Sequence, residues 1–152
     1  MDNLSKFSER LDELIFDAGL TNKQFSKALG ISTSTVSCWK NAKHKLSLSH
    51  ALMIADYFGC SLEFLAGRAG EKLDYTPHPY PPFYERLLQI MKIHGKSRYR
   101  MVRETKFSDG NFYSWKKGGE PYLQSVIELA DYFKLTLDAF IGRETYLTKP
   151  LN

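Results

Sequence analysis

Apolar residues recur at helical spacing near the beginning of the chain. They lie at i, i+4, i+7, i+8 and i+11, which places them on one face of an α-helix. These residues are Phe7, Leu11, Leu14, Ile15 and Ala18. A glycine follows directly, where a helix often ends in a left-handed residue. The pattern predicts an amphipathic helix that buries this face.

The same pattern returns in the second half of the chain. It keeps one register up to a turn-like stretch and is shifted by a single deletion after it. The matched segments include Phe7–Leu11 with Phe83–Leu87, Trp39–Lys40 with Trp115–Lys116, and Ala55–Phe58 with Ala130–Phe133. Chance similarity does not keep register in this way, and loops are where a change of length costs least. We therefore interpret the chain as an internal repeat.

Each copy is expected to form five short helices. Hydroxyl side chains that suit helix N-caps precede the second helix (Thr21 and Ser97) and the third (Ser32 and Ser108). The fourth helix is expected to bury Leu48, Ala51, Leu52, Ala55 and Phe58 in one copy, and Leu123, Val126, Ile127, Ala130 and Phe133 in the other. The fifth helix is expected from Ser61 to Leu65 and from Thr136 to Phe140. No alternating pattern typical of strands stands out.

These elements predict an all-α protein with two tandem five-helix domains, at residues 1–68 and 83–143. Residues 69–82 contain four prolines, which exclude regular helix and favour a stiff, extended linker. Residues 144–152 form a tail without a clear pattern.

Composition limits the class of protein. Hydrophobic residues make up 43% of the 152 residues, enough for a core, and two cysteines cannot form a disulfide scaffold. No run approaches the ~18–20 apolar residues of a membrane span, and the first sixteen residues lack the apolar stretch of a signal peptide. We expect a soluble, cytoplasmic protein with no membrane partner.

The net charge is +4, and the basic excess lies in the second half of the chain. Residues 83–143 carry eleven Lys and Arg against seven Asp and Glu, whereas residues 1–68 carry eight against seven. This is a mild bias toward polyanions, which many unrelated enzymes share.

One segment of each copy carries a recognisable pattern. In the first copy its residues are Thr21, Gln24, Leu29, Gly30, Ile31, Ser32, Val36, Ser37 and Trp39, with Leu52, Ile54, Ala55 and Leu62 further on. This pattern closely resembles the helix-turn-helix of the Cro and lambda-repressor-like (xenobiotic-response-element type) regulators. The second copy keeps Ser97, Ser108, Trp115 and Gly118, but Lys106 and Phe112 replace Gly30 and Val36.

The resemblance implies that the third helix enters the major groove of double-stranded DNA. Val36 and Trp39 must face the core, and we prefer core packing to base stacking for both tryptophans. The base-reading residues of the first copy are then Thr33, Ser34, Ser37 and Cys38. The phosphate-binding residues near the start of the second helix and beyond the third are Asn22, Lys23, Gln24, Lys40 and Lys43.

The second copy has a different set of outward residues. Those that would face bases are Asp109, Gly110, Asn111, Tyr113 and Ser114, and those that would meet phosphate are Arg98, Arg100, Lys116 and Lys117. Asp109 repels phosphate but can accept a hydrogen bond from cytosine N4. We interpret this copy as a second DNA-binding unit whose affinity is dominated by backbone charge.

Neither copy contains a catalytic pattern such as a Gly-rich phosphate loop, GxSxG or HExxH. The four histidines lack metal-ligand spacing. We therefore expect no enzyme activity, no metal and no cofactor.

The leading hypothesis is a sequence-specific transcriptional regulator, a repressor of bacterial or phage type that joins the nucleoid when bound to DNA. The alternative is a protein-interaction module or antitoxin-like partner that uses the same fold. The sequence leaves open a homodimer or an intramolecular pseudo-dimer of the two copies.

Overall fold

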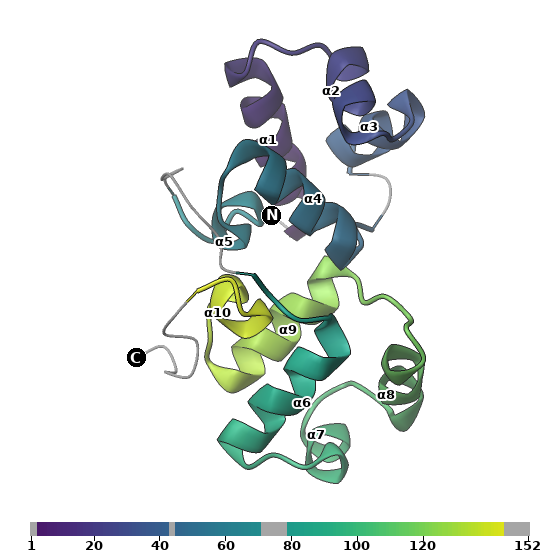
Figure 1. Ribbon diagram of the computed structural model, residues 1–152, viewed down its shortest axis with the longest axis vertical. Helices are drawn as coiled ribbons and strands as arrows, with labels where there is room; N and C mark the ends of the chain where they lie inside the picture. Colours follow the sequence, from purple (N-terminus) through teal and green to yellow (C-terminus); the bar gives the residue numbers. More distant parts are fainter. Residues whose placement is uncertain (1–2, 43–44, 71–78, 145–152) are drawn as a thin grey trace. The chain divides into compact units, whose positions relative to one another are not determined.

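The computed structural model describes residues 3–42, 45–70 and 79–144, which form α-helices and no β-strand (Figure 1). In the first half of the chain the helices are α1 (Asn3–Asp17), α2 (Asn22–Leu29), α3 (Thr33–Lys40), α4 (Leu48–Phe58) and α5 (Leu62–Leu65). In the second half they are α6 (Phe83–His94), α7 (Arg98–Glu104), α8 (Asp109–Lys116), α9 (Leu123–Phe133) and α10 (Leu137–Ile141). The predicted all-α class is confirmed for these residues.

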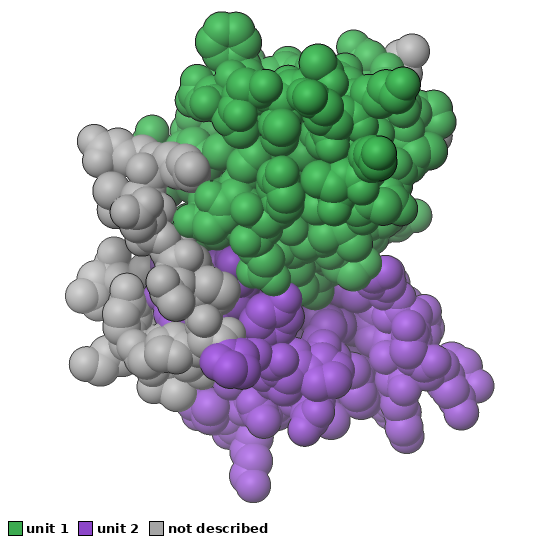
Figure 2. Space-filling view, turned by 45° about the horizontal axis from the view of Figure 1, so that its top comes forward, with its two compact units in different colours: residues 1–76, 122–124 green, residues 77–121, 125–152 purple. Residues whose placement is uncertain are grey.

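The chain divides into two compact units, drawn in different colours in Figure 2. The first unit is Met1–Thr76 with Tyr122–Gln124, and the second is Pro77–Pro121 with Ser125–Asn152. The division after residue 76 falls inside the predicted linker, of which residues 71–78 lie outside the described part, as does the tail from residue 145. The tandem-domain boundaries of the sequence analysis stay a prediction.

In the first unit α1 packs against α3 and α5. The predicted face of α1 is buried at Phe7, Leu11, Leu14 and Ile15. The prediction is wrong for Ala18, which is exposed. Ala18 lies directly after the last residue of α1, Asp17, and its amide still donates to Leu14 O at 3.1 Å, so helical spacing alone does not decide its burial.

The buried face of α4 is also shifted from the prediction. Leu48, Ala51 and Ala55 are buried, but Leu52 and Phe58 are only half-buried. Ile54 is fully buried in their place. It lies three residues after Ala51 and next to Ala55, at the centre of the face that packs inward, whereas Leu52 lies at its edge.

In the second unit α6 packs against α8 and α10. Leu87, Ile90 and Met91 of α6 are buried. Phe83 is half-buried, with its ring edge-on to Trp115 at 5.3 Å between centroids. The predicted core positions of α9 are all buried; Leu123 belongs to the first unit and the other four belong to the second.

In each unit an ion pair joins the last short helix to an arginine just after it. Arg68 Nε lies 3.2 Å from Glu63 Oε2, and Arg143 Nη1 lies 2.7 Å from Asp138 Oδ1. In the register that matches Ala55–Phe58 with Ala130–Phe133, the two pairs occupy matching positions. Both side chains of the second pair are fully buried, whereas those of the first remain partly exposed.

Candidate nucleic-acid interface

Side-chain caps define the start of both α2 and α3. Thr21 Oγ1 accepts a hydrogen bond from Gln24 N at 3.1 Å, and Gln24 Oε1 accepts one from Thr21 N at 2.9 Å, which completes a capping box. Gly30 ends α2 in the left-handed conformation with φ of 71°. Ser32 then caps α3 through Thr35 N at 3.1 Å. These local bonds confirm the predicted caps and produce a helix, a tight turn and a second helix.

The core contacts of α3 decide which of its faces is outward. Val36 is fully buried, and Trp39 is buried with its ring 5.1 Å from that of His50. The backbone oxygen of Trp39 also accepts a hydrogen bond from Ser8 Oγ of α1. The prediction that Trp39 packs in the core is confirmed, and the opposite side of α3 faces solvent.

The outward side of α3 carries small hydroxyl groups. Thr33, Ser34 and Ser37 are exposed, and Cys38 is half-buried. Ser34 Oγ lies 3.1 Å from Ser32 Oγ, and Ser37 Oγ accepts a weak bond from Asn41 Nδ2 at 3.4 Å. The structure therefore brings the predicted base-reading set of the first copy together on one helix face.

A recess of about 380 Å³ adjoins this face. It is lined by Ser34, Thr35, Cys38, Trp39, Lys45 and His50. Its hydroxyl, imidazole and ammonium groups can donate hydrogen bonds to acceptors such as phosphate or base-edge oxygens.

The predicted phosphate residues of the first copy fall into two groups. Lys23 and Gln24 are exposed in the first turn of α2. Lys40 Nζ instead donates to Asn22 Oδ1 at 2.9 Å and lies 3.1 Å from Asp12 Oδ1. Lys43 lies outside the described residues.

Residues 10–67 match the family model of a Cro/C1-type HTH DNA-binding domain. No curated protein and no solved structure matches the chain. The matched residues contain α2, the turn and α3, so the match supports a lambda-repressor-like helix-turn-helix in the first unit. This domain is of a type that binds DNA in regulators.

In the second unit α7 and α8 begin with the predicted caps. Ser97 Oγ accepts from Arg100 N at 3.1 Å, and Ser108 Oγ accepts from Asn111 N at 3.3 Å. Asn111 Oδ1 accepts from Ser108 N at 2.8 Å, which completes a capping box. The side-chain oxygen of Asn111 therefore holds the start of α8, a role that the sequence analysis did not assign to it.

The turn between α7 and α8 is built without the left-handed glycine of the first unit. Thr105, in extended conformation, follows α7. Its Oγ1 donates to Met101 O at 2.6 Å and accepts from Phe107 N at 3.1 Å. These two bonds take over the turn-forming role that Gly30 has in the first unit, so Lys106 needs no left-handed backbone.

The outward face of α8 carries the other predicted base-facing residues. Asp109, Gly110, Tyr113 and Ser114 are all exposed, while Phe112 and Trp115 are buried. A Cβ added at Gly110 would meet only Ser108 Oγ, at 3.4 Å, so packing does not require glycine there.

Carboxylates accompany several basic residues of the second unit. Arg98 Nε lies 3.4 Å from Asp109 Oδ1, Arg100 Nε lies 2.9 Å from Glu104 Oε2, and Lys106 Nζ lies 2.8 Å from Glu128 Oε2. Lys116 and Lys117 are exposed on the last turn of α8 and directly after it. The basic surface is thus partly neutralised by its own side chains.

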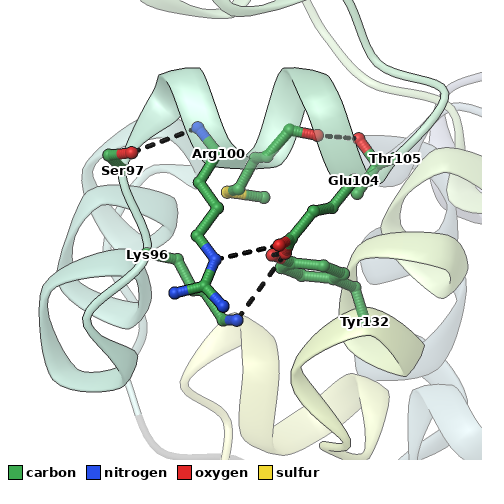
Figure 3. Close-up of polar contacts among 7 residues, drawn as sticks. Lys96, Ser97, Arg100, Glu104, Thr105 and Tyr132 are labelled. Carbon is green, nitrogen blue, oxygen red and sulfur yellow. Dashed lines mark hydrogen bonds and ion pairs between the residues drawn. The ribbon is translucent and has the colours of Figure 1, made fainter.

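Glu104 is the centre of the largest of these groups (Figure 3). Tyr132 Oη of α9 donates to Glu104 Oε1 at 2.5 Å, and Lys96 Nζ lies 3.7 Å from the same oxygen. The hydrogen bonds from Tyr132 and Arg100 lower the pKa of Glu104 to about 2. Burial, together with the bond to Glu104, raises the pKa of Tyr132 to about 12. Sequence reasoning missed this cluster, although the spacing of Arg100 and Glu104 is that of a helical ion pair.

Two kinds of feature are absent from the residues that the structure describes. No three His, Cys, Asp or Glu side chains in this part of the chain are grouped as metal ligands. None of its helices has the length and apolar character needed to cross a membrane.

Proposed function

We propose that the protein is a sequence-specific DNA-binding transcriptional regulator, a repressor of bacterial or phage type. One observation carries the proposal: an exposed face of hydroxyl groups on α3, held by buried Val36 and Trp39, inside a segment that matches a DNA-binding domain. Because the protein would act on DNA, we place it in the cytoplasm in this proposal, and at the nucleoid when it is bound to DNA.

In this proposal α3 lies in the major groove. Thr33, Ser34 and Ser37 approach base edges, because short side chains let the helix come close and hydroxyls both donate and accept. Lys23 and Gln24, at the positive N-terminal end of α2, bind phosphate oxygens and fix the orientation of the helix. Hydroxyl contacts suit several bases, so we expect modest specificity from this unit.

The second unit is proposed as a second helix-turn-helix with α8 as its reading helix. Its support is the repeat in sequence, the capped α7–turn–α8 arrangement and the exposed lysines Lys116 and Lys117. The carboxylates beside Arg98 and Arg100 reduce the share of affinity that we expect from backbone charge alone.

The test of DNA binding is selection from random double-stranded DNA, followed by gel shifts of the enriched sequence. The Ser34→Ala and Ser37→Ala variants should each lose about 1–3 kcal/mol of discrimination at particular base pairs. Lys23→Gln is the matched control from α2 and should weaken all sequences alike. Failure to enrich any sequence, with no retention of random DNA at low salt, would reject the proposal.

One observation favours the second candidate, a protein-interaction module or antitoxin-like partner. Tyr99 and Tyr113 of the second unit are 74% and 64% exposed, and both lie beside a basic group, Arg103 and Lys117 respectively. Tyrosine and arginine are enriched in protein interfaces. A partner recovered by full-length protein, and lost with a Tyr99→Ser and Tyr113→Ser double variant that still binds DNA, would support this role.

A further inference from the structure

The first residues of α7 and α8 form an ion pair. Arg98 begins α7, Asp109 begins α8, and their charged groups approach to 3.4 Å. Both side chains are well exposed, at 60% and 74%. They line a recess of about 560 Å³ together with Tyr99, Val102 and Arg103. A carboxylate and a guanidinium therefore lie together in an exposed recess of this unit.

The first unit has no such pair. In the register that matches Phe7 with Phe83, Asn22 occupies the place of Arg98 and Thr33 the place of Asp109. Both are uncharged, and Asn22 Oδ1 accepts a bond from Lys40. The ion pair is therefore a specific feature of the second unit and is not required to form a capped two-helix arrangement.

Asp109 restricts what can approach α8. An ionised carboxylate only accepts hydrogen bonds, so it disfavours base edges that offer acceptors alone, such as guanine N7 and O6 or thymine O4. Cytosine N4 and adenine N6 present amino donors in the major groove. A carboxylate at this place would therefore distinguish the two groups of bases.

Arg98 can exchange Asp109 for another partner at little cost in free energy. Exposed ion pairs contribute little to stability, because water screens them and both side chains lose freedom. A phosphate oxygen offers a guanidinium a stronger, bidentate partner. The pair Arg100–Glu104 differs, since Tyr132 and Lys96 hold its carboxylate in place.

We propose that Asp109 is the specificity-determining residue of the second unit, and that it selects an exocyclic amino group, cytosine N4 or adenine N6, in the major groove. On binding, Arg98 leaves Asp109 for a phosphate, and the base amino group replaces it as the donor to the carboxylate. This inference rests on the proposed DNA-binding function and names the base chemistry that the second unit recognises.

The experiment compares full-length protein with the Asp109→Asn variant in selection from random DNA. Wild type should prefer cytosine or adenine at one position by roughly ten-fold over guanine or thymine. Asparagine can donate to guanine or thymine acceptors and can still pair with adenine N6 and N7, so the variant should lose the preference for cytosine and bind random DNA several-fold more tightly. The matched control is Glu85→Gln, an exposed carboxylate on α6 of the same unit, which should leave the base preference unchanged.

The outcomes separate this inference from the function on which it rests. Arg98→Gln should weaken all sequences by a similar factor and keep the preference, because Arg98 binds phosphate in the complex. The Ser108–Asn111 capping box does not involve the side chain of Asp109, so α8 should remain folded, and circular dichroism checks that the variant keeps the helix content of wild type. An Asp109→Asn protein with unchanged preference and unchanged affinity for random DNA would overturn the role of Asp109, even if Ser34 and Ser37 still read bases. Absence of DNA binding by wild type would overturn the proposed function itself.

Discussion

Asp138 and Arg143 form a fully buried ion pair in the second unit, 2.7 Å apart. Removing one charge leaves the other buried without its counter-ion, which costs about 3–5 kcal/mol in comparable cases. We predict a loss of this size in the free energy of unfolding for Asp138→Asn. Glu63→Gln is the matched control, because the Glu63–Arg68 pair is partly exposed and water can solvate the remaining arginine.

Tryptophan fluorescence can follow the two units separately. Trp39 belongs to the first unit and Trp115 to the second, and the sequence has no other tryptophan. Urea unfolding of Asp138→Asn in a Trp39→Phe background reports on the second unit, and Glu63→Gln in a Trp115→Phe background reports on the first. Equal losses for the two variants would show that burial does not set the strength of these pairs.

At the scale of single residues, helix caps were predictable and burial at helix edges was not. Thr21, Ser32, Ser97 and Ser108 cap helices through backbone groups three residues away, a relation that sequence spacing contains. Ala18 is exposed although its amide keeps the helical hydrogen bond to Leu14 O. Burial of this kind depends on packing of neighbouring helices, which local periodicity does not contain.

At the scale of elements, α7 and α9 are joined through Glu104, Arg100 and Tyr132. Pairing lowers the pKa of Glu104 from 4.5 to about 2, so the folded state favours the ionised carboxylate. Its contribution to stability is therefore complete above pH 4.5 and is lost as the pH falls from about 4.5 to about 2. We predict that Glu104→Gln flattens this acid limb of the stability curve.

The measurement is the thermal unfolding midpoint of wild type and Glu104→Gln between pH 2 and pH 7. The difference between the two proteins should be largest at neutral pH and should vanish near pH 2. Tyr132→Phe is a second variant for the same measurement, because it removes the hydrogen bond that lowers the pKa of Glu104 most. A difference that stays constant over the whole pH range would contradict the assignment of this pair.

The Glu104 cluster also marks what sequence alone could not provide for the candidate site. Arg100 and Glu104 are four residues apart and could be paired from helical spacing, but Tyr132 lies on another helix, far along the chain. The outward faces of α3 and α8 were predictable, because buried Val36 and Trp115 fix the rotation of each helix. Which basic residues have a carboxylate beside them required the folded structure.

At the scale of the whole molecule, salt dependence measures how many cations meet DNA. The proposed phosphate contacts include Lys23, Lys40, Lys43, Arg98, Arg100, Lys116 and Lys117. About six to eight such contacts give a log–log slope of roughly −5 to −7 against salt concentration. We predict the shallower end of this range, because phosphate displaces the weak ion pairs of Lys40 and Arg98, whereas Arg100 keeps Glu104 and about six contacts remain.

The slope also tests whether the ion pairs survive binding. If Lys40, Arg98 and Arg100 kept their carboxylates, about four contacts would remain and the slope would be close to roughly −3.5. Filter binding at several salt concentrations distinguishes these values. An affinity that did not change with salt would show that these residues do not contact the DNA backbone.

The last prediction concerns the shape of the DNA site. The two proposed reading helices differ, with Thr33, Ser34 and Ser37 on α3 against Asp109 and Tyr113 on α8. Two half-sites one helical turn apart are separated by about 34 Å, and joining two units in one chain raises the effective concentration of the second. We predict an asymmetric site of about two turns bound by a single chain acting as a pseudo-dimer.

Footprinting and the mass of the complex in solution decide between this arrangement and a homodimer. A pseudo-dimer protects two unlike half-sites with one chain per DNA, and Ser34→Ala and Asp109→Asn should then change opposite halves of the footprint. A homodimer that reads DNA with one unit and pairs through the other protects a palindrome with two chains per DNA. Because two copies of one reading helix must meet identical half-sites, a symmetric footprint would exclude the pseudo-dimer while leaving DNA binding by α3 intact.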